Sequence, residues 1–252
     1  MSGSRAKMQG QAKRNRPARI ANSEMVTRSA EAVLNVDLSD LAFRSRTSQV
    51  VVGLCRAAFA QSKIIAMLAK ANLLSAAAPN RRLVLEIALR LHWLQGCPRE
   101  ERRTAVDTML AKDRQDTNRL LEYLRDEGHE VDFDPTEMDA FQLDEVTNGA
   151  IHQQATRLNA AVRSSEVKPW SIYSMWLGET QLAHASGNLA GKYAPTHDDL
   201  HLSSGVPDPM DPDLEAHRIL QAHIVVTTGY LLADEGLPEE FARRIQAAFL
   251  AV

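Results

Sequence analysis

The sequence predicts an all-α protein, an up-and-down bundle of about six to seven helices. Apolar residues recur at spacings of three and four through most of the chain, which gathers them on one face of a helix. No segment sustains the two-residue alternation of a half-buried strand, and Gly-rich turns between short apolar runs are missing. No internal repeat is evident at periods of about 30 to 45 residues, so a solenoid is not indicated.

The composition fits one sizeable core, because 44% of the 252 residues are hydrophobic. We expect one helical domain over residues 24–252 rather than two domains. Residues 1–23 hold six basic side chains and no acidic one, so this segment carries +6 and the remaining chain −9. The basic tail is expected to be disordered and could contact nucleic-acid phosphates. The acidic body argues against a broad duplex-binding face.

Cysteine usage and hydropathy indicate the cytoplasm. Cys55 and Cys97 form no C-x-x-C pair, so neither a disulfide scaffold nor a thiolate metal site is indicated. The chain has no run of about 18 uncharged apolar residues, and no apolar segment follows the basic N-terminus. We therefore expect no membrane span and no secretory signal.

The first half of the chain contains the most apolar helices. Residues 24–46 predict a short amphipathic helix that docks loosely, and 48–74 a long, mostly buried one. Residues 81–95 are apolar in nearly every direction, which marks a central helix, with Asn80 as a candidate N-cap. Dense alternating charge over 98–128 predicts a helix on the outside of the bundle.

The second half is more interrupted. Asp134 and Pro135 predict the start of a helix that reaches about residue 164, with a break near 147–149. A further helix is expected over 170–189. Four prolines and two glycines make 191–213 a long loop. Helices over 214–235 and 239–250 complete the chain.

Two stripes of side chains predict a site between two central helices. At about 100° per residue, positions i, i+4, i+7 and i+11 share one narrow face. One such stripe is polar at three of its four positions, and the other carries two charges within an apolar helix. The stripes consist of Tyr173, Leu177, Thr180 and His184, and of Arg82, Glu86, Leu89 and Trp93.

Arg82 precedes Glu86 by four residues, the less favourable order for a local ion pair. Buried charges need partners, so we expect each to meet the other helix, with Thr180 and Tyr173 in support. A Glu86–His184 contact would hold the imidazole in one tautomer, which would leave Arg82 to bind an anion. The alternative interpretation is a satisfied polar network that only fixes the register of the two helices.

Other catalytic or ligand-binding patterns are weak. His197 and His201 have metal-like spacing, but they lie in a Pro-rich loop, where an exposed polar segment is the plainer interpretation. Glu179 and His184 lack the Glu-x-x-His spacing of a carboxylate-bundle metal site. Gly-rich phosphate loops and a G-x-S-x-G elbow are absent. We therefore expect no metal and no cofactor.

The two stripes resemble a family of uncharacterised prokaryotic all-helical proteins, over about residues 48–235. In that family one helix reads Arg-x-x-x-Glu and a later one Tyr, then Ser/Thr-x-x-x-His-x-Ser, here Arg82, Glu86, Tyr173, Thr180, His184 and Ser186. The family is also similar to the HEPN helical-bundle ribonucleases of toxin and phage-defence systems, in which an Arg and a His cleave RNA. This chain lacks their Arg-x(4–6)-His on a single helix: Arg125 to His129 is one residue short, and Arg90 and His92 are too close.

Two functions of different class follow from these residues. The first is a binding or regulatory bundle that uses Arg82, Glu86, Thr180 and His184 as a network or an anion pocket. The second is a metal-independent ribonuclease effector, for which the resemblance implies His184 and Arg82 as catalytic residues. RNA or another anionic ligand is the expected partner, and the chain could also associate into an oligomer.

Overall fold

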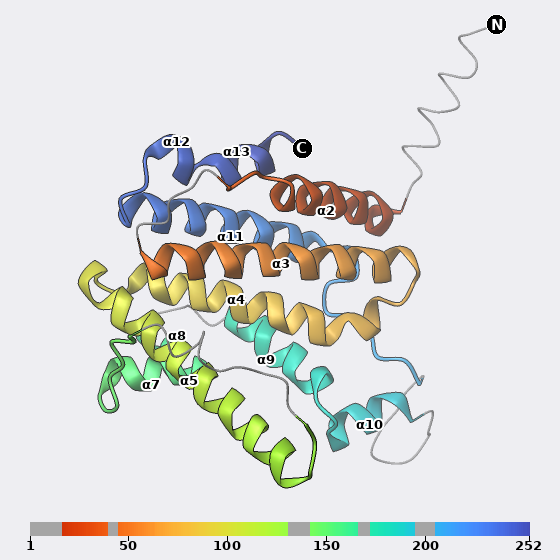
Figure 1. Ribbon diagram of the computed structural model, residues 1–252. Coiled ribbons are helices and arrows are strands. Elements are labelled where there is room, and N and C mark those ends of the chain that lie inside the picture. Colours follow the sequence, from red (N-terminus) through yellow and green to blue (C-terminus); the bar gives the residue numbers. More distant parts are fainter. Residues whose placement is uncertain (1–16, 40–44, 131–141, 166–171, 195–204) are drawn as a thin grey trace, which may run out of the picture.

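The computed structural model describes residues 17–39, 45–130, 142–165, 172–194 and 205–252, and the regular structure in those ranges is entirely helical (Figure 1). The predicted all-α class is confirmed. In chain order the elements are α2 (Ala18–Leu34), α3 (Arg46–Lys70), the 3₁₀ turn η1 (Leu74–Ala77), α4 (Ala78–Gly96), α5 (Arg99–Asp126), α7 (Ala150–Thr156), α8 (Leu158–Ser164), α9 (Ile172–Ala183), α10 (Gly187–Tyr193), α11 (Glu215–Asp234), α12 (Glu239–Ala242) and α13 (Arg244–Leu250).

Two long helices, α3 and α4, form the centre of the bundle. α3 packs against α2, α4 and α11, and α4 packs in addition against α8 and α9 (Figure 1). Phe59 and Ile65 of α3 and Leu91 of α4 have no exposed surface. Burial of each such side chain stabilises the fold by about 1.5–3 kcal/mol. The packing of α3 and α4 therefore supplies much of the driving force for folding.

α3 is long and apolar enough to cross a membrane by length and composition, and it is the one such helix in the described ranges. A core helix of a soluble protein has the same character, and here α2, α4 and α11 cover it. The absence of a membrane span stays a prediction.

The N-terminal boundary expected at residue 23 needs correction. α2 begins at Ala18, and its contacts are not loose, because Val26, Ala30 and Val33 are fully buried. Asn22 is also buried; its Nδ2 donates to the carbonyl of Asp213, 2.7 Å away. This long-range hydrogen bond and the apolar face hold residues 18–23 in a helix. Residues 1–16 of the predicted tail lie outside the described ranges.

Helix breaks explain why the bundle has more helices than the predicted six or seven. Arg157 is extended, with φ −127° and ψ 111°, and separates α7 from α8. The helix expected over 170–189 divides into α9 and α10, with Ser186 capping α10 by accepting from the amide of Leu189 at 3.2 Å. His184 therefore lies just beyond the end of α9. The expected helix start at Asp134 lies outside the described ranges.

Candidate functional site

The two predicted stripes meet at Arg82 and His184. Arg82 Nη1 lies 2.6 Å from His184 Nε2. Because a guanidinium can only donate, Nε2 accepts, and the ring in this contact carries its proton on Nδ1. His184 is exposed and the Arg82 side chain is 25% exposed, so solvent reaches this pair.

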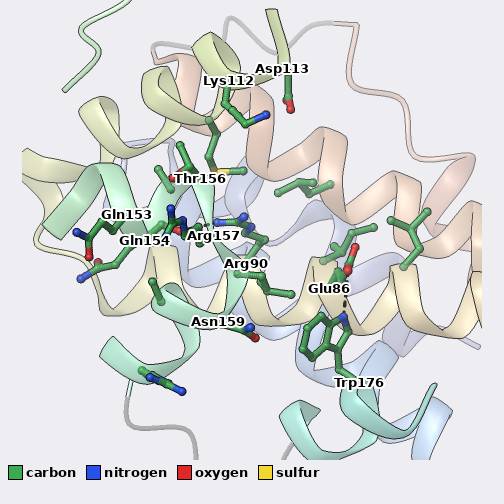
Figure 2. Close-up of a pocket in the computed structure, with 18 of the residues that line it drawn as sticks. Glu86, Arg90, Lys112, Asp113, Gln153, Gln154, Thr156, Arg157, Asn159 and Trp176 are labelled. Carbon is green, nitrogen blue, oxygen red and sulfur yellow. Dashed lines mark hydrogen bonds between the residues drawn. The ribbon is translucent and has the colours of Figure 1, made fainter. Parts of the chain in front are cut away.

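Glu86 does not make the expected contact with His184, because Arg82 lies between them. Glu86 Oε1 forms an ion pair with Arg82 Nη2 at 2.9 Å. The same oxygen accepts a hydrogen bond from the indole Nε1 of Trp176 at 3.0 Å (Figure 2). The guanidinium carbon of Arg82 lies 5.8 Å from the centroid of the Trp176 ring. Arg82 and Glu86 thus form the local ion pair that the sequence order disfavours, and Trp176 anchors the carboxylate.

Thr180 and Tyr173 both contact this network at Trp176. Thr180 Oγ1 donates to the carbonyl of Trp176, 2.7 Å away on its own helix. The Tyr173 ring stacks on Trp176 at a centroid distance of 5.7 Å, and its hydroxyl donates to Asn159 Oδ1 at 3.4 Å. Tyr173 therefore packs against the network, and Thr180 satisfies its hydroxyl locally.

A buried ion pair that the two stripes did not include joins the same two helices. Its members, Arg81 and Glu179, each precede a stripe residue by one position. Arg81 Nε and Nη2 donate to the two carboxylate oxygens of Glu179 at 2.6 and 3.0 Å, and Arg81 Nη1 donates to the carbonyl of Leu74 at 2.6 Å. Arg81 is 4% exposed and Glu179 2%. One signal could have found the pair: Glu179 is the only charged residue in α9.

A small chamber adjoins this ion pair. A cavity of about 60 Å³ is lined by residues that include Arg81, Glu179, Met210 and His217. His217 Nε2 lies 3.0 Å from Ser62 Oγ. Burial, reinforced by the charge of Arg81, lowers the pKa of His217 to about 4, so this imidazole is neutral at pH 7. The chamber is too small for anything beyond a few atoms, so its residues serve the interior of the bundle.

Met210 closes the chamber by packing onto α9 where Gly178 leaves room for it. A Cβ at position 178 would lie 2.4 Å from Met210 Sδ and 2.6 Å from its Cε. The next residue, Asp211, accepts through its two carboxylate oxygens from the amides of Ala216 and His217 at 3.3 and 2.8 Å. The segment before α11 is thus attached to α9 through Met210 and to the first turn of α11 through Asp211.

A cleft of about 1070 Å³ lies between α4, α5, α7, α8 and α9 (Figure 2). Glu86 and Trp176 lie at one end of it, and Gln153 and Gln154 lie at the other. Arg82, the ion-pair partner of Glu86, also lines the cleft. We call it the α4–α5 cleft. Its charged lining residues are Arg82, Glu86, Arg90, Lys112, Asp113, Asp116, Arg157 and Arg163.

Pairing leaves positive charge in this cleft. Glu86 neutralises Arg82, and Asp116 neutralises Lys112. Three guanidiniums then face one carboxylate, that of Asp113, and burial, assisted by the charge of Asp116, raises the pKa of Asp113. The pKa of Arg90 is lowered chiefly by burial, so its charged form is poorly solvated.

The three guanidiniums without a carboxylate partner differ in their contacts. Arg90 Nη1 donates to the carbonyl of Gln154 at 2.8 Å, and its guanidinium carbon lies 5.7 Å from the centroid of the Trp93 ring. Arg157 and Arg163 are exposed, and in the part of the chain that the structure describes neither side chain has a hydrogen bond or ion pair. The donors of Arg157 and Arg163 are free to bind a ligand.

Metal-like clusters of three or more His, Cys, Asp or Glu side chains do not occur among the described residues. His197 and His201 lie outside those ranges. Comparisons of the chain with protein-family models, with curated proteins and with solved structures gave no match. The resemblance to a prokaryotic helical family and to HEPN bundles therefore stays a prediction.

Proposed function

We propose that this protein is a binding protein whose α4–α5 cleft takes a ligand with at least two anionic groups, such as phosphates. The observation that carries the proposal is the set of three guanidiniums, from Arg90, Arg157 and Arg163, that share one cleft and form no salt bridge with a carboxylate among the described residues. Guanidinium donors match the geometry of phosphate and carboxylate oxygens, and they do so best where water is partly excluded.

Each guanidinium gives the cleft a different property. Arg90 is desolvated, so a bound anion would replace part of its lost hydration. Arg157 and Arg163 are exposed and can reorganise around a ligand. Arg82 already contacts Glu86 and His184. It therefore borders the cleft and does not form the main anion contact.

Calorimetric titration with pyrophosphate tests the proposal. Arg157→Ala should weaken binding by roughly tenfold or more, because a charge-assisted hydrogen bond contributes about 1.5–3 kcal/mol. The matched control is Arg28→Ala on α2, an exposed arginine remote from the cleft. Wild-type protein that does not bind pyrophosphate, or an equal loss in both variants, would contradict the proposal.

The second candidate function is RNA cleavage, and solvent access to Arg82 and His184 favours it. A sealed pair could not process RNA, whereas this one is open to solvent beside a basic cleft. In cleavage Arg82 would hold a phosphate, and His184 would transfer protons. The basic segment 1–23 could add phosphate contacts.

An assay on labelled single-stranded RNA, with a chelator present to exclude metal-dependent nucleases, tests this second function. Cleavage by wild-type protein that is lost in both His184→Ala and Arg82→Ala would establish it. Equal cleavage by all three proteins would assign the activity to a contaminant and dismiss the function. The cytoplasm stays the expected compartment on the sequence grounds given above.

A further inference from the structure

The outer face of α11 is apolar although α11 is a surface helix on that side. Its exposed positions between Arg218 and Leu232 are Ile219, Val226 and Tyr230, with exposed fractions of 72%, 40% and 63%. No charged residue occurs from residue 219 to residue 233. A helix that faced only water would carry polar side chains there, so this face indicates a protein contact.

The stripe on this face is self-complementary when it is reversed about Val226. Ile219 and Ala233 lie at equal distances from Val226 along the helix, and so do Ala222 and Tyr230. An antiparallel pair of α11 helices centred on Val226 would therefore set each large side chain against an alanine of the other copy. A parallel pair would instead set Tyr230 against Tyr230.

Charges at the two ends of the stripe obey the same symmetry. Arg218 and Asp234 are each eight positions from Val226, so the antiparallel arrangement sets the arginine of one copy level with the aspartate of the other along the helix axis. Among the described residues Arg218 has only a neutral side-chain partner, the Oδ1 of Asn22 at 2.8 Å. The Asp234 side chain is 53% exposed even though it pairs with Arg102. Both charges can therefore accept a second partner.

The surface beside the stripe offers room for the other copy. A depression of about 450 Å³ at the C-terminal end of α11 is lined by Tyr230 and Asp234 and by Gln95 and Arg102 of neighbouring helices. In the antiparallel pairing it would receive the most exposed residue of the stripe, Ile219 of the second copy. Small side chains facing large ones, opposite charges at both ends and a depression at one end all suit the same twofold arrangement.

We propose that two copies of this chain associate as a symmetric dimer through antiparallel α11 helices, with Val226 on the twofold axis. The proposal is independent of the anion site, because the α4–α5 cleft contains no residue of α11.

Light scattering coupled to size-exclusion chromatography tests the association on the full chain. Wild-type protein should have the mass of two chains, and Val226→Glu the mass of one, because two carboxylates would meet on the axis. Leu120→Glu on α5, at a position 57% exposed, is the matched control and should keep the dimer mass. A cooperative thermal melt of Val226→Glu would show that the variant folds.

Disulfide crosslinking tests the direction of the helices. Under a mild copper–phenanthroline oxidant, Val226→Cys should crosslink to its own copy, and Ile219→Cys should not, since antiparallel pairing separates the two 219 positions. The native Cys55 and Cys97 are buried and should not compete. A single-chain mass for wild-type protein at every concentration, a dimer that persists in Val226→Glu, or equal crosslinking at both positions would overturn the proposal.

Discussion

Arg81 and Arg82 are neighbours on α4, both reach α9, and their surroundings are opposite. Arg81 forms a two-point ion pair with Glu179 in the interior, whereas Arg82 contacts His184 and Glu86 at the edge of an open cleft. One step along a helix rotates a side chain by about 100°, which is enough to move it from core to surface. Residue type alone therefore does not distinguish a buried charge from one at the edge of a cleft.

The largest expected effect is the loss of one member of the buried pair. Glu179→Ala leaves the Arg81 guanidinium buried without its carboxylate, so we expect the free energy of unfolding to fall by about 3–5 kcal/mol in a urea titration. Because replacing both partners removes both buried charges, the double variant Arg81→Met, Glu179→Leu should recover much of that loss. A single variant within experimental error of wild type would show that the pair is not buried.

Acid should destabilise the fold through His217, which lines the chamber beside Arg81. The folded pKa of His217 is about 4, below the ordinary value of 6.5. The unfolded chain therefore binds a proton that the native chain does not, and stability falls as pH drops from about 6.5 to 4. The loss amounts to roughly 3 kcal/mol at the acid end.

Urea titrations at several pH values would measure this loss, with His217→Gln as the comparison. The variant should lack this part of the pH dependence, because glutamine does not titrate. An identical pH profile in the two proteins would exclude His217 as the source.

At the surface network the expected effects are smaller. Glu86→Ala removes the ion-pair partner of Arg82 and the hydrogen-bond acceptor of Trp176, and the Glu86 side chain is 31% exposed. We expect a loss of about 1 kcal/mol in a thermal or urea melt. Glu86→Gln keeps an oxygen for the indole donor and should lose less; a larger loss in Glu86→Gln than in Glu86→Ala would contradict these contacts.

The smallest expected effect belongs to His184→Ala. The side chain is exposed and lies beyond the end of α9, so the free energy of unfolding should change by about 0.5 kcal/mol or less. A melt therefore cannot distinguish a binding role from a catalytic one at this residue. The RNA-cleavage assay makes that distinction, whereas a destabilisation as large as that of Glu179→Ala would show that His184 is structural.

Sequence reasoning found the all-α class and the meeting of α4 with α9, because long apolar stripes depend only on helical periodicity. It identified Arg82 and His184 as neighbours for the same reason. It misjudged the phase of α9: the buried residues are Trp176 and Glu179, while Leu177 is 42% exposed. A phase depends on which neighbours cover a helix, and those contacts come from distant parts of the chain.

The sequence did not predict the cleft, for a related reason. Arg90 comes from α4, Arg163 from α8 and Arg157 from the break between α7 and α8, and each alone resembles an ordinary solvated arginine. Only the fold places them on one surface. The helix break at Arg157, between α7 and α8, contains no glycine or proline that would predict it from the sequence.

The reactivity of the two buried cysteines can report how often the native structure opens. Burial raises the pKa of both Cys55 and Cys97 to about 11 from 9.0, which lowers the thiolate fraction at neutral pH by roughly a hundredfold. A thiol reagent in native buffer then reacts only with molecules that have transiently opened. Since Cys55 lies within α3 and Cys97 follows α4, their separate labelling rates would measure how often the structure opens at each of these two positions.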